Sequence, residues 1–223
     1  HKVGLPTFYG QAFLPDVCEL APEMLPYTKR YFEEFLKTGT IREVRPSELW
    51  YTSRTDFSPE ALGTELPAHK NSGFELLQGP AQFEGEILGG CIDSMYEMFS
   101  GWRYGDMPEV CRNYGLFPAK DDWRGKILLM ESCEEYMPPE TYKKALETLQ
   151  ETGVFDAVSG VLVGKPMDDM YHGEYKKLLV ETISNKELPI LCNINVGHAQ
   201  PRCILPFGVP AHVDADAQVI RFG

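Results

Sequence analysis

The chain has 223 residues, of which 43% are hydrophobic and 12% aromatic, so it can bury a sizeable core. Its 33 acidic residues outnumber the 21 basic ones, the formal net charge is −12, and no basic stripe is present that could follow a phosphate backbone. We therefore expect no nucleic-acid partner. No apolar run is long enough to cross a bilayer and no signal-peptide pattern opens the chain, so we expect no membrane contact and a cytoplasmic location.

The six cysteines are dispersed without a C-x-x-C pair, and the five histidines do not have the close spacing of metal ligands. Several of the cysteines lie within apolar runs, where a thiol behaves as a small hydrophobic side chain. The pattern predicts neither a disulfide framework nor a metal site, and we expect no cofactor.

The N-terminal part of the chain predicts a strand followed by a helix. Residues 1–10 have the character of a strand. Residues 21–37 predict a helix, because Pro22 suits a first helical turn and aromatic side chains such as Tyr31 recur at helical spacing.

We interpret residues 1–40 as the remnant of an N-terminal α/β domain whose sheet is absent. On that interpretation the aromatic side chains of Phe8, Tyr31 and Phe35 should remain exposed, or pair with another copy. The polar stretch that follows is broken by prolines and glycine and shows no sustained period. Residues 41–72 are therefore predicted to be an extended linker.

Beyond the linker the predicted elements become short and separated by glycines. Residues 74–79, 81–85 and 86–90 predict three short strands, as in a meander or a barrel corner. Residues 94–99 predict a helix, and a glycine-flanked loop with Trp102 follows.

The remaining sequence alternates between apolar strands and helices. Pro-Pro at the start and Gly153 at the end bound the clearest helix of the chain. The alternation predicts a parallel α/β unit, with strands at 127–130, 158–163 and 190–194 and helices at 138–153 and 174–184.

Two polar side chains follow the ends of strands in this unit. Glu131 is the first polar residue after strand 127–130, and Gly197-His198 follows strand 190–194. Because the carboxyl ends of parallel strands meet at one edge of a sheet, we expect both side chains to lie within hydrogen-bond reach or to face one cleft. A histidine there can act as a general base and the carboxylate can orient it. The alternative is a solvated histidine in a turn.

Four segments of the chain carry a family pattern. They are Gly-Lys-Ile-Leu-Leu-Met-Glu at 125–131, Gly-Val-Leu-Val-Gly-Lys at 160–165, Gly-His at 197–198 and Pro-Phe-Gly-Val-Pro-Ala at 206–211. Together they resemble the C-terminal domain of the LD-carboxypeptidase family of serine peptidases, which includes a microcin-immunity branch. The resemblance implies an α/β fold in which residues 73–223 form a β/β/α domain of the swivelling, partial-barrel kind.

The resemblance also implies roles for individual residues. Glu131 and His198 match the catalytic glutamate and histidine of a Ser/His/Glu triad. The sequence contains no Gly-x-Ser-x-Gly nucleophile motif, so we expect the serine in an N-terminal domain that this chain lacks. Further candidates, for substrate binding, are Gly89, Gly90, Trp102 and Lys165.

For the complete protein the resemblance implies hydrolysis of an amide in a small peptide, such as a murein tetrapeptide, or in an aminoacyl nucleotide. We expect a homodimer, and we expect this chain alone to be inactive. Two alternatives remain open. Cys91 stands where the family usually has an asparagine and could serve as the nucleophile of a complete thiol hydrolase. The chain could also be a non-catalytic binding or dimerisation module.

Overall fold

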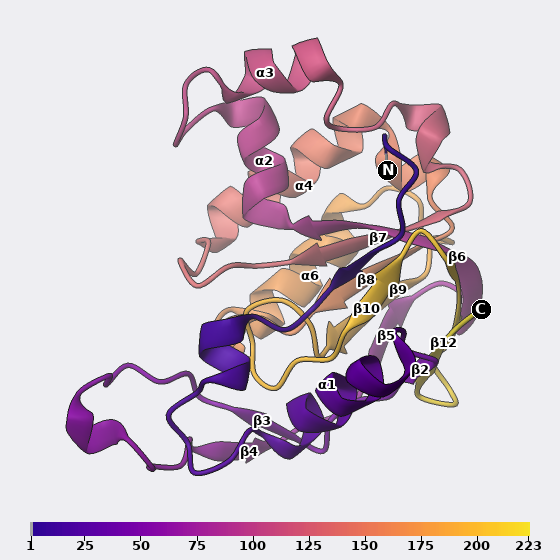
Figure 1. The fold of residues 1–223 in the computed structure, drawn as a ribbon. Helices are drawn as coiled ribbons and strands as arrows, with labels where there is room; N and C mark the ends of the chain where they lie inside the picture. Colours follow the sequence, from indigo (N-terminus) through magenta and orange to yellow (C-terminus); the bar gives the residue numbers. More distant parts are fainter. Residues whose placement is uncertain (1) are drawn as a thin grey trace.

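The computed structural model describes residues 2–223 and contains a mixed sheet of eight strands flanked by helices (Figure 1). Residue 1, part of the predicted strand 1–10, lies outside the described residues. In spatial order the sheet consists of β2 (Glu43–Val44), β12 (Val219–Phe222), β11 (Pro210–Asp214), β6 (Gln82–Cys91), β7 (Lys126–Glu131), β8 (Gly160–Gly164), β9 (Ile190–Ile194) and β5 (Glu75–Gln78).

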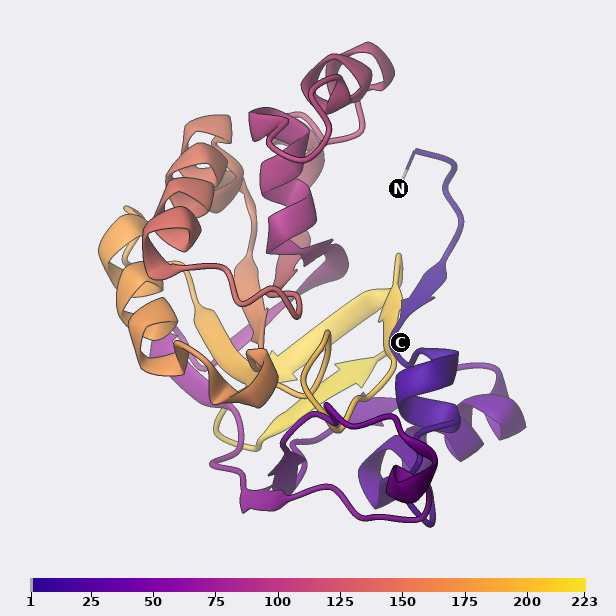
Figure 2. The same cartoon turned by 90° about the vertical axis from the view of Figure 1, so that its left-hand side faces the viewer.

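The four central strands, β6 to β9, are parallel and follow one another in sequence order. Right-handed crossovers between strands added in one direction place every connecting helix on the same face. Figure 2 shows this arrangement, with the connecting helices on one side of the sheet and the N-terminal segment on the other. The connecting helices are α2 (Ile92–Ser100), α3 (Met107–Tyr114), α4 (Pro139–Thr152), α5 (Val154–Ala157) and α6 (His172–Thr182).

Alternation along β7 divides the buried side chains between two cores. Leu128 and Met130 face the core beneath the connecting helices, whereas Ile127 and Leu129 face the opposite core. Because strand side chains alternate between the two faces, Glu131 is expected on the same side as Ile127 and Leu129. This side is covered by helix α1 (Pro26–Thr38) and by strand β10 (Leu205–Phe207).

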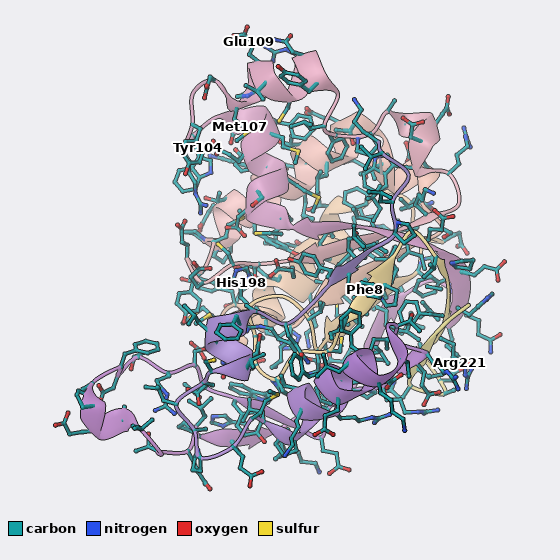
Figure 3. All side chains as sticks on the ribbon, in the orientation of Figure 1. Phe8, Tyr104, Met107, Glu109, His198 and Arg221 are labelled. Carbon is teal, nitrogen blue, oxygen red and sulfur yellow. The ribbon has the colours of Figure 1, made fainter. Side chains whose placement is uncertain are left out.

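The predicted α/β class is confirmed, and the predicted parallel unit is present with small shifts of its boundaries. The sheet stays open, since β2 and β5 form opposite ends of the described strand order. Two details differ from the prediction. The strands expected at 81–85 and 86–90 form one continuous strand, β6, and the region after Trp102 contains a helix, α3, that was not predicted. In Figure 3, Met107 and Glu109 mark this helix.

The N-terminal segment packs against the same core as the central sheet. Strand β1 (Thr7–Tyr9) pairs with β10, and a short π-helix spans Phe13–Val17. The expectation that Tyr31 stays exposed was wrong, because its side chain is fully buried and its hydroxyl accepts a hydrogen bond from the Arg45 backbone N–H at 3.0 Å. Only Phe8, at 42% exposure, behaves clearly as expected among the aromatic side chains named for this segment.

The segment between α1 and β5 contains little regular structure. Besides β2, it contains a two-stranded ribbon of β3 (Leu49–Tyr51) and β4 (Ala68–Lys70), and a 3-10 turn at Pro59–Ala61. Two further 3-10 turns lie later in the chain, at Lys120–Trp123 and Met167–Asp169. The division into residues 1–40, 41–72 and 73–223 stays a prediction. Within residues 2–223 we find no helix whose length and apolar character would let it traverse a bilayer.

Because Tyr31 joins α1 to the main core, Tyr31→Ala should lower the free energy of unfolding by roughly 3–5 kcal/mol, the usual cost of emptying an aromatic site. Leu36→Ala on the same helix is the matched control, because Leu36 is 68% exposed and should change stability little. Chemical denaturation of both variants measures the difference. Equal unfolding midpoints would contradict the packing of α1 described above.

Candidate active site

Glu131 and His198 meet at the carboxyl edge of the parallel strands. Glu131 is the last residue of β7, and His198 lies in the loop that follows β9. The imidazole Nδ1 lies 2.8 Å from the Glu131 Oε2 atom. The predicted proximity of the two residues is therefore confirmed. Figure 3 shows His198 among the loops at this edge, with Arg221 on the opposite side of the molecule.

The two partners differ sharply in their access to solvent. Glu131 is 1% exposed, whereas 36% of the His198 side chain is exposed. A buried carboxylate is costly unless it is hydrogen bonded, so its oxygens need fixed donors. The imidazole is held at its inner nitrogen, and its outer nitrogen, Nε2, remains available to groups near the surface.

The position before His198 requires a glycine, Gly197. Its φ is +90°, and an added Cβ would lie 2.3 Å from the Glu131 Oε2 atom. A larger residue would therefore collide with the carboxylate and also strain the backbone. The glycine permits the loop after β9 to approach the end of β7 closely enough for His198 to reach Glu131.

Tyr9 supplies the second donor to Glu131, and the sequence did not reveal it. The Tyr9 hydroxyl donates to the Glu131 Oε1 atom at 2.7 Å, so each carboxylate oxygen has its own partner. The Tyr9 ring stacks on Phe207 at a centroid distance of 5.6 Å, across the β1–β10 pair. Burial, followed by the neighbouring Glu131 charge, raises the pKa of Tyr9 well above its ordinary value, so the phenol remains a donor.

Arg202 fixes the backbone of the loop that carries His198. Its Nη2 donates to the His198 carbonyl oxygen at 2.5 Å, and its Nη1 pairs with the Asp16 Oδ2 atom at 2.7 Å. Both side chains of this ion pair are nearly fully buried. Removing one member would leave a buried charge without a partner, which is strongly destabilising. The pair therefore ties the π-helix to the loop that carries His198.

The surroundings of His198 favour its protonated form. Its pKa is raised chiefly by the hydrogen bond to Glu131; partial burial opposes this, and the charges of Glu131 and Glu134 add to it, while Arg202 acts against them. The Glu134 Oε2 atom lies 3.1 Å from Nε2, and the Glu134 side chain is 62% exposed. Glu134 can therefore rotate into solvent at little cost and uncover Nε2.

Gly89 and Gly90 lie in β6 directly beside the pair. An added Cβ at Gly89 would lie 2.1 Å from the Leu129 carbonyl oxygen, and one at Gly90 would lie 3.4 Å from the Tyr9 ring. At these positions glycine therefore permits close packing against β7 and Tyr9. Their predicted role in substrate binding stays a prediction.

The other two predicted binding residues differ in how free their side chains are. Trp102 is 57% exposed, in the turn between α2 and α3, with the Arg103 guanidinium 4.7 Å from its ring centroid. Lys165 is 4% exposed; its ammonium pairs with Asp169 and lies 4.8 Å from the centroid of the Trp50 ring. Trp102 thus offers a free ring face, whereas Lys165 is already engaged within the chain.

Cys91 lacks the features of an activated thiol. Burial, then the Glu131 charge, raises its pKa to about 12, so the thiol is protonated at neutral pH. Its thiol donates to the Asp93 carboxylate at 3.6 Å, and within residues 2–223 no hydrogen bond joins it to His198. This arrangement does not favour the thiol-hydrolase alternative.

Because the hydrogen bond to Glu131, followed by the charges of Glu131 and Glu134, raises the pKa of His198, Glu131→Gln should lower this pKa markedly, and Glu134→Gln should lower it by a smaller amount. Proton NMR titration of the histidine ring signals measures both shifts. His212, which pairs with the exposed Glu84, should be unaffected and serves as the internal control. A His198 pKa unchanged by Glu131→Gln would contradict the assigned hydrogen bond.

Both a family model and a known relative match the part of the chain that carries Glu131 and His198. Residues 84–213, more than half of the chain, match the family model described as the LD-carboxypeptidase C-terminal domain. The chain is 26% identical over 221 residues to the microcin C7 self-immunity protein MccF of Escherichia coli; the match covers 96% of this chain and 58% of that protein. The chain thus spans somewhat over half of that relative's length.

Solved structures give the same result. The MccF-like protein from Streptococcus pneumoniae, solved in complex with AMP, matches with 57% identity and a TM-score of 0.98, covering all of this chain and 65% of that one. The microcin C7 self-immunity protein MccF in complex with aspartyl sulfamoyl adenosine matches with 25% identity and a TM-score of 0.74, covering 99% and 62%. The family predicted from sequence is confirmed: the chain belongs to the LD-carboxypeptidase family and carries its C-terminal domain.

Proposed function

We propose that this chain supplies the glutamate and histidine of a serine-type amide hydrolase, with the nucleophilic hydroxyl provided by polypeptide outside residues 1–223. The observation that carries the proposal is the bond between His198 Nδ1 and buried Glu131, combined with an outer Nε2 whose partner, Glu134, is an exposed side chain. A base held at one nitrogen and freed at the other when Glu134 moves is what nucleophile activation requires.

In the proposed reaction His198 Nε2 takes the proton as the serine oxygen attacks the amide carbon. Glu131 stabilises the imidazolium that forms and fixes the ring orientation. The imidazolium then gives this proton to the leaving nitrogen, and the C–N bond breaks to leave an acyl-serine ester. A water molecule, deprotonated by the same imidazole, attacks the ester and releases the acid and the free serine.

Tyr9 and Arg202 would position this base without touching the substrate. Tyr9 holds the carboxylate oxygen that His198 does not use, and Arg202 holds the backbone of the histidine loop. Glu134 must leave Nε2 before a hydroxyl can approach, and its exposure allows that movement.

The substrate class that fits best is an aminoacyl nucleotide or a related small peptide amide. Support comes from two relatives, one solved with AMP and the other with aspartyl sulfamoyl adenosine. The exposed ring of Trp102 offers a surface on which a base could stack. The murein tetrapeptide remains the alternative substrate, as relatives in the same family are described as carboxypeptidases.

Contact with further polypeptide is part of the proposal. Val3, Leu5, Phe13 and Leu14 are each at least 68% exposed, an unusual density of apolar surface for one short segment. The rest of the enzyme or a second copy in a homodimer would cover it. The cytoplasmic location stays a prediction.

In the complete gene product, His198→Asn and Glu131→Gln should each lower kcat for hydrolysis of aspartyl sulfamoyl adenosine by about 10²–10⁴-fold, the usual contribution of a general base and its support. Released aspartate, quantified by mass spectrometry, is the readout. His212→Asn is the matched control, because His212 lies on β11 with an exposed ring. Turnover by both variants at the control's rate would refute the proposed roles.

A further inference from the structure

Three potential metal ligands converge next to the Glu131–His198 pair. Cys91 ends β6, Asp93 lies in the first turn of α2, and Cys133 follows β7 by two residues. One ligand atom from each, the two Sγ atoms and a carboxylate oxygen, all lie within 4.8 Å of one another. Two neighbouring parallel strands therefore bring together residues that are far apart in the sequence.

The Asp93 carboxylate is buried without a cationic partner. Its side chain is 3% exposed, and its Oδ2 atom accepts from the Cys133 backbone N–H at 3.1 Å and from the Cys91 thiol at 3.6 Å. In residues 2–223 no lysine, arginine or histidine nitrogen lies within ion-pair distance of it. Buried carboxylates are normally paired or bound to metal, because an isolated buried charge is costly.

The donor set selects the kind of ion. Thiolate sulfur favours Zn²⁺ and other thiophilic ions, whereas Mg²⁺ and Ca²⁺ require oxygen ligands. Two cysteines and one carboxylate complete three positions of a tetrahedron, and a water molecule can fill the fourth. Tetrahedral Zn–S and Zn–O bonds of about 2.0–2.3 Å would require the three side chains to draw together by only a small movement.

The three ligands differ in their access to solvent. Cys91 is partly exposed and gives the cluster its contact with solvent, whereas Cys133 is 7% exposed. Arg103 is a neighbour of the cluster, because its guanidinium contacts Cys133 and pairs with Glu135. Metal binding would therefore exchange the Arg103 contact with Cys133 for a bond from the sulfur to the ion, while Glu135 retains the arginine.

We propose that Cys91, Asp93 and Cys133 form a binding site for a thiophilic divalent cation, with Zn²⁺ as the representative ion. Binding would release the two thiol protons and form two metal–thiolate bonds and one metal–carboxylate bond. Since Cys91 pairs in register with Glu131, the ion would add positive charge beside the carboxylate that supports His198. If the proposed function holds, occupancy should inhibit hydrolysis.

The test is titration of the reduced, metal-free chain with Co²⁺, followed by displacement with Zn²⁺. We expect one equivalent per chain and a thiolate-to-cobalt charge-transfer absorption that Zn²⁺ abolishes. Cys91→Ser and Cys133→Ser should each lose the absorption, and Asp93→Asn should weaken binding by at least tenfold. Cys111→Ser is the matched control, because Cys111 lies on α3 and is 5% exposed, close to the 7% of Cys133. This variant should bind the ion like the parent chain.

This readout needs no substrate, so its failure is distinguishable from failure of the proposed function. Thermal melting without metal identifies any variant that does not fold. If a serine variant does not fold, alkylation of the parent chain takes its place as the test: Zn²⁺ should protect Cys91 and Cys133 from the alkylating reagent. Absence of stoichiometric binding, no such protection, or loss of the absorption in Cys111→Ser would each overturn the proposal.

Discussion

The buried carboxylate of Glu131 is the constraint on which the site depends. Its two oxygens are satisfied by separate donors, Tyr9 and His198, and it is 1% exposed. Neither donor is close to Glu131 in sequence. Satisfying this one charge therefore requires β1, the end of β7 and the loop after β9 to assemble together, and loss of any one of them leaves a buried acceptor without its partner.

Several neighbouring residues support the contacts of the Glu131 carboxylate. Gly197 permits the loop to approach the carboxylate, Phe207 supports the Tyr9 ring, and Arg202 anchors the His198 backbone to the π-helix through Asp16. The N-terminal segment is therefore part of the site as well as of the core. The hydrogen bond to Glu131, followed by the charges of Glu131 and of Glu134 at the rim, raises the pKa of His198.

The sequence predicted the parallel unit and the meeting of Glu131 with His198, because strand ends in such a unit share one edge and the residue order alone locates them. It could not predict Tyr9, since that contact depends on the antiparallel pairing of β1 with β10, which local pattern does not encode. The burial of Tyr31 was missed because it depends on the packing of α1 against the core of the sheet, which the helical spacing of its aromatic residues does not specify. The grouping of Cys91 with Cys133 likewise follows from the register of β6 on β7, whereas sequence spacing suggested no metal site.

The most direct test of the account is the tautomer of neutral His198, because a base supported by Glu131 must carry its proton on Nδ1 and leave Nε2 bare. Nitrogen-15 NMR of the labelled chain, recorded above the raised pKa of His198, distinguishes the two ring nitrogens. The account predicts a protonated Nδ1 and an unprotonated Nε2, and a change in this pattern when Glu131 is replaced by glutamine. A proton found mainly on Nε2 in the parent chain would contradict it.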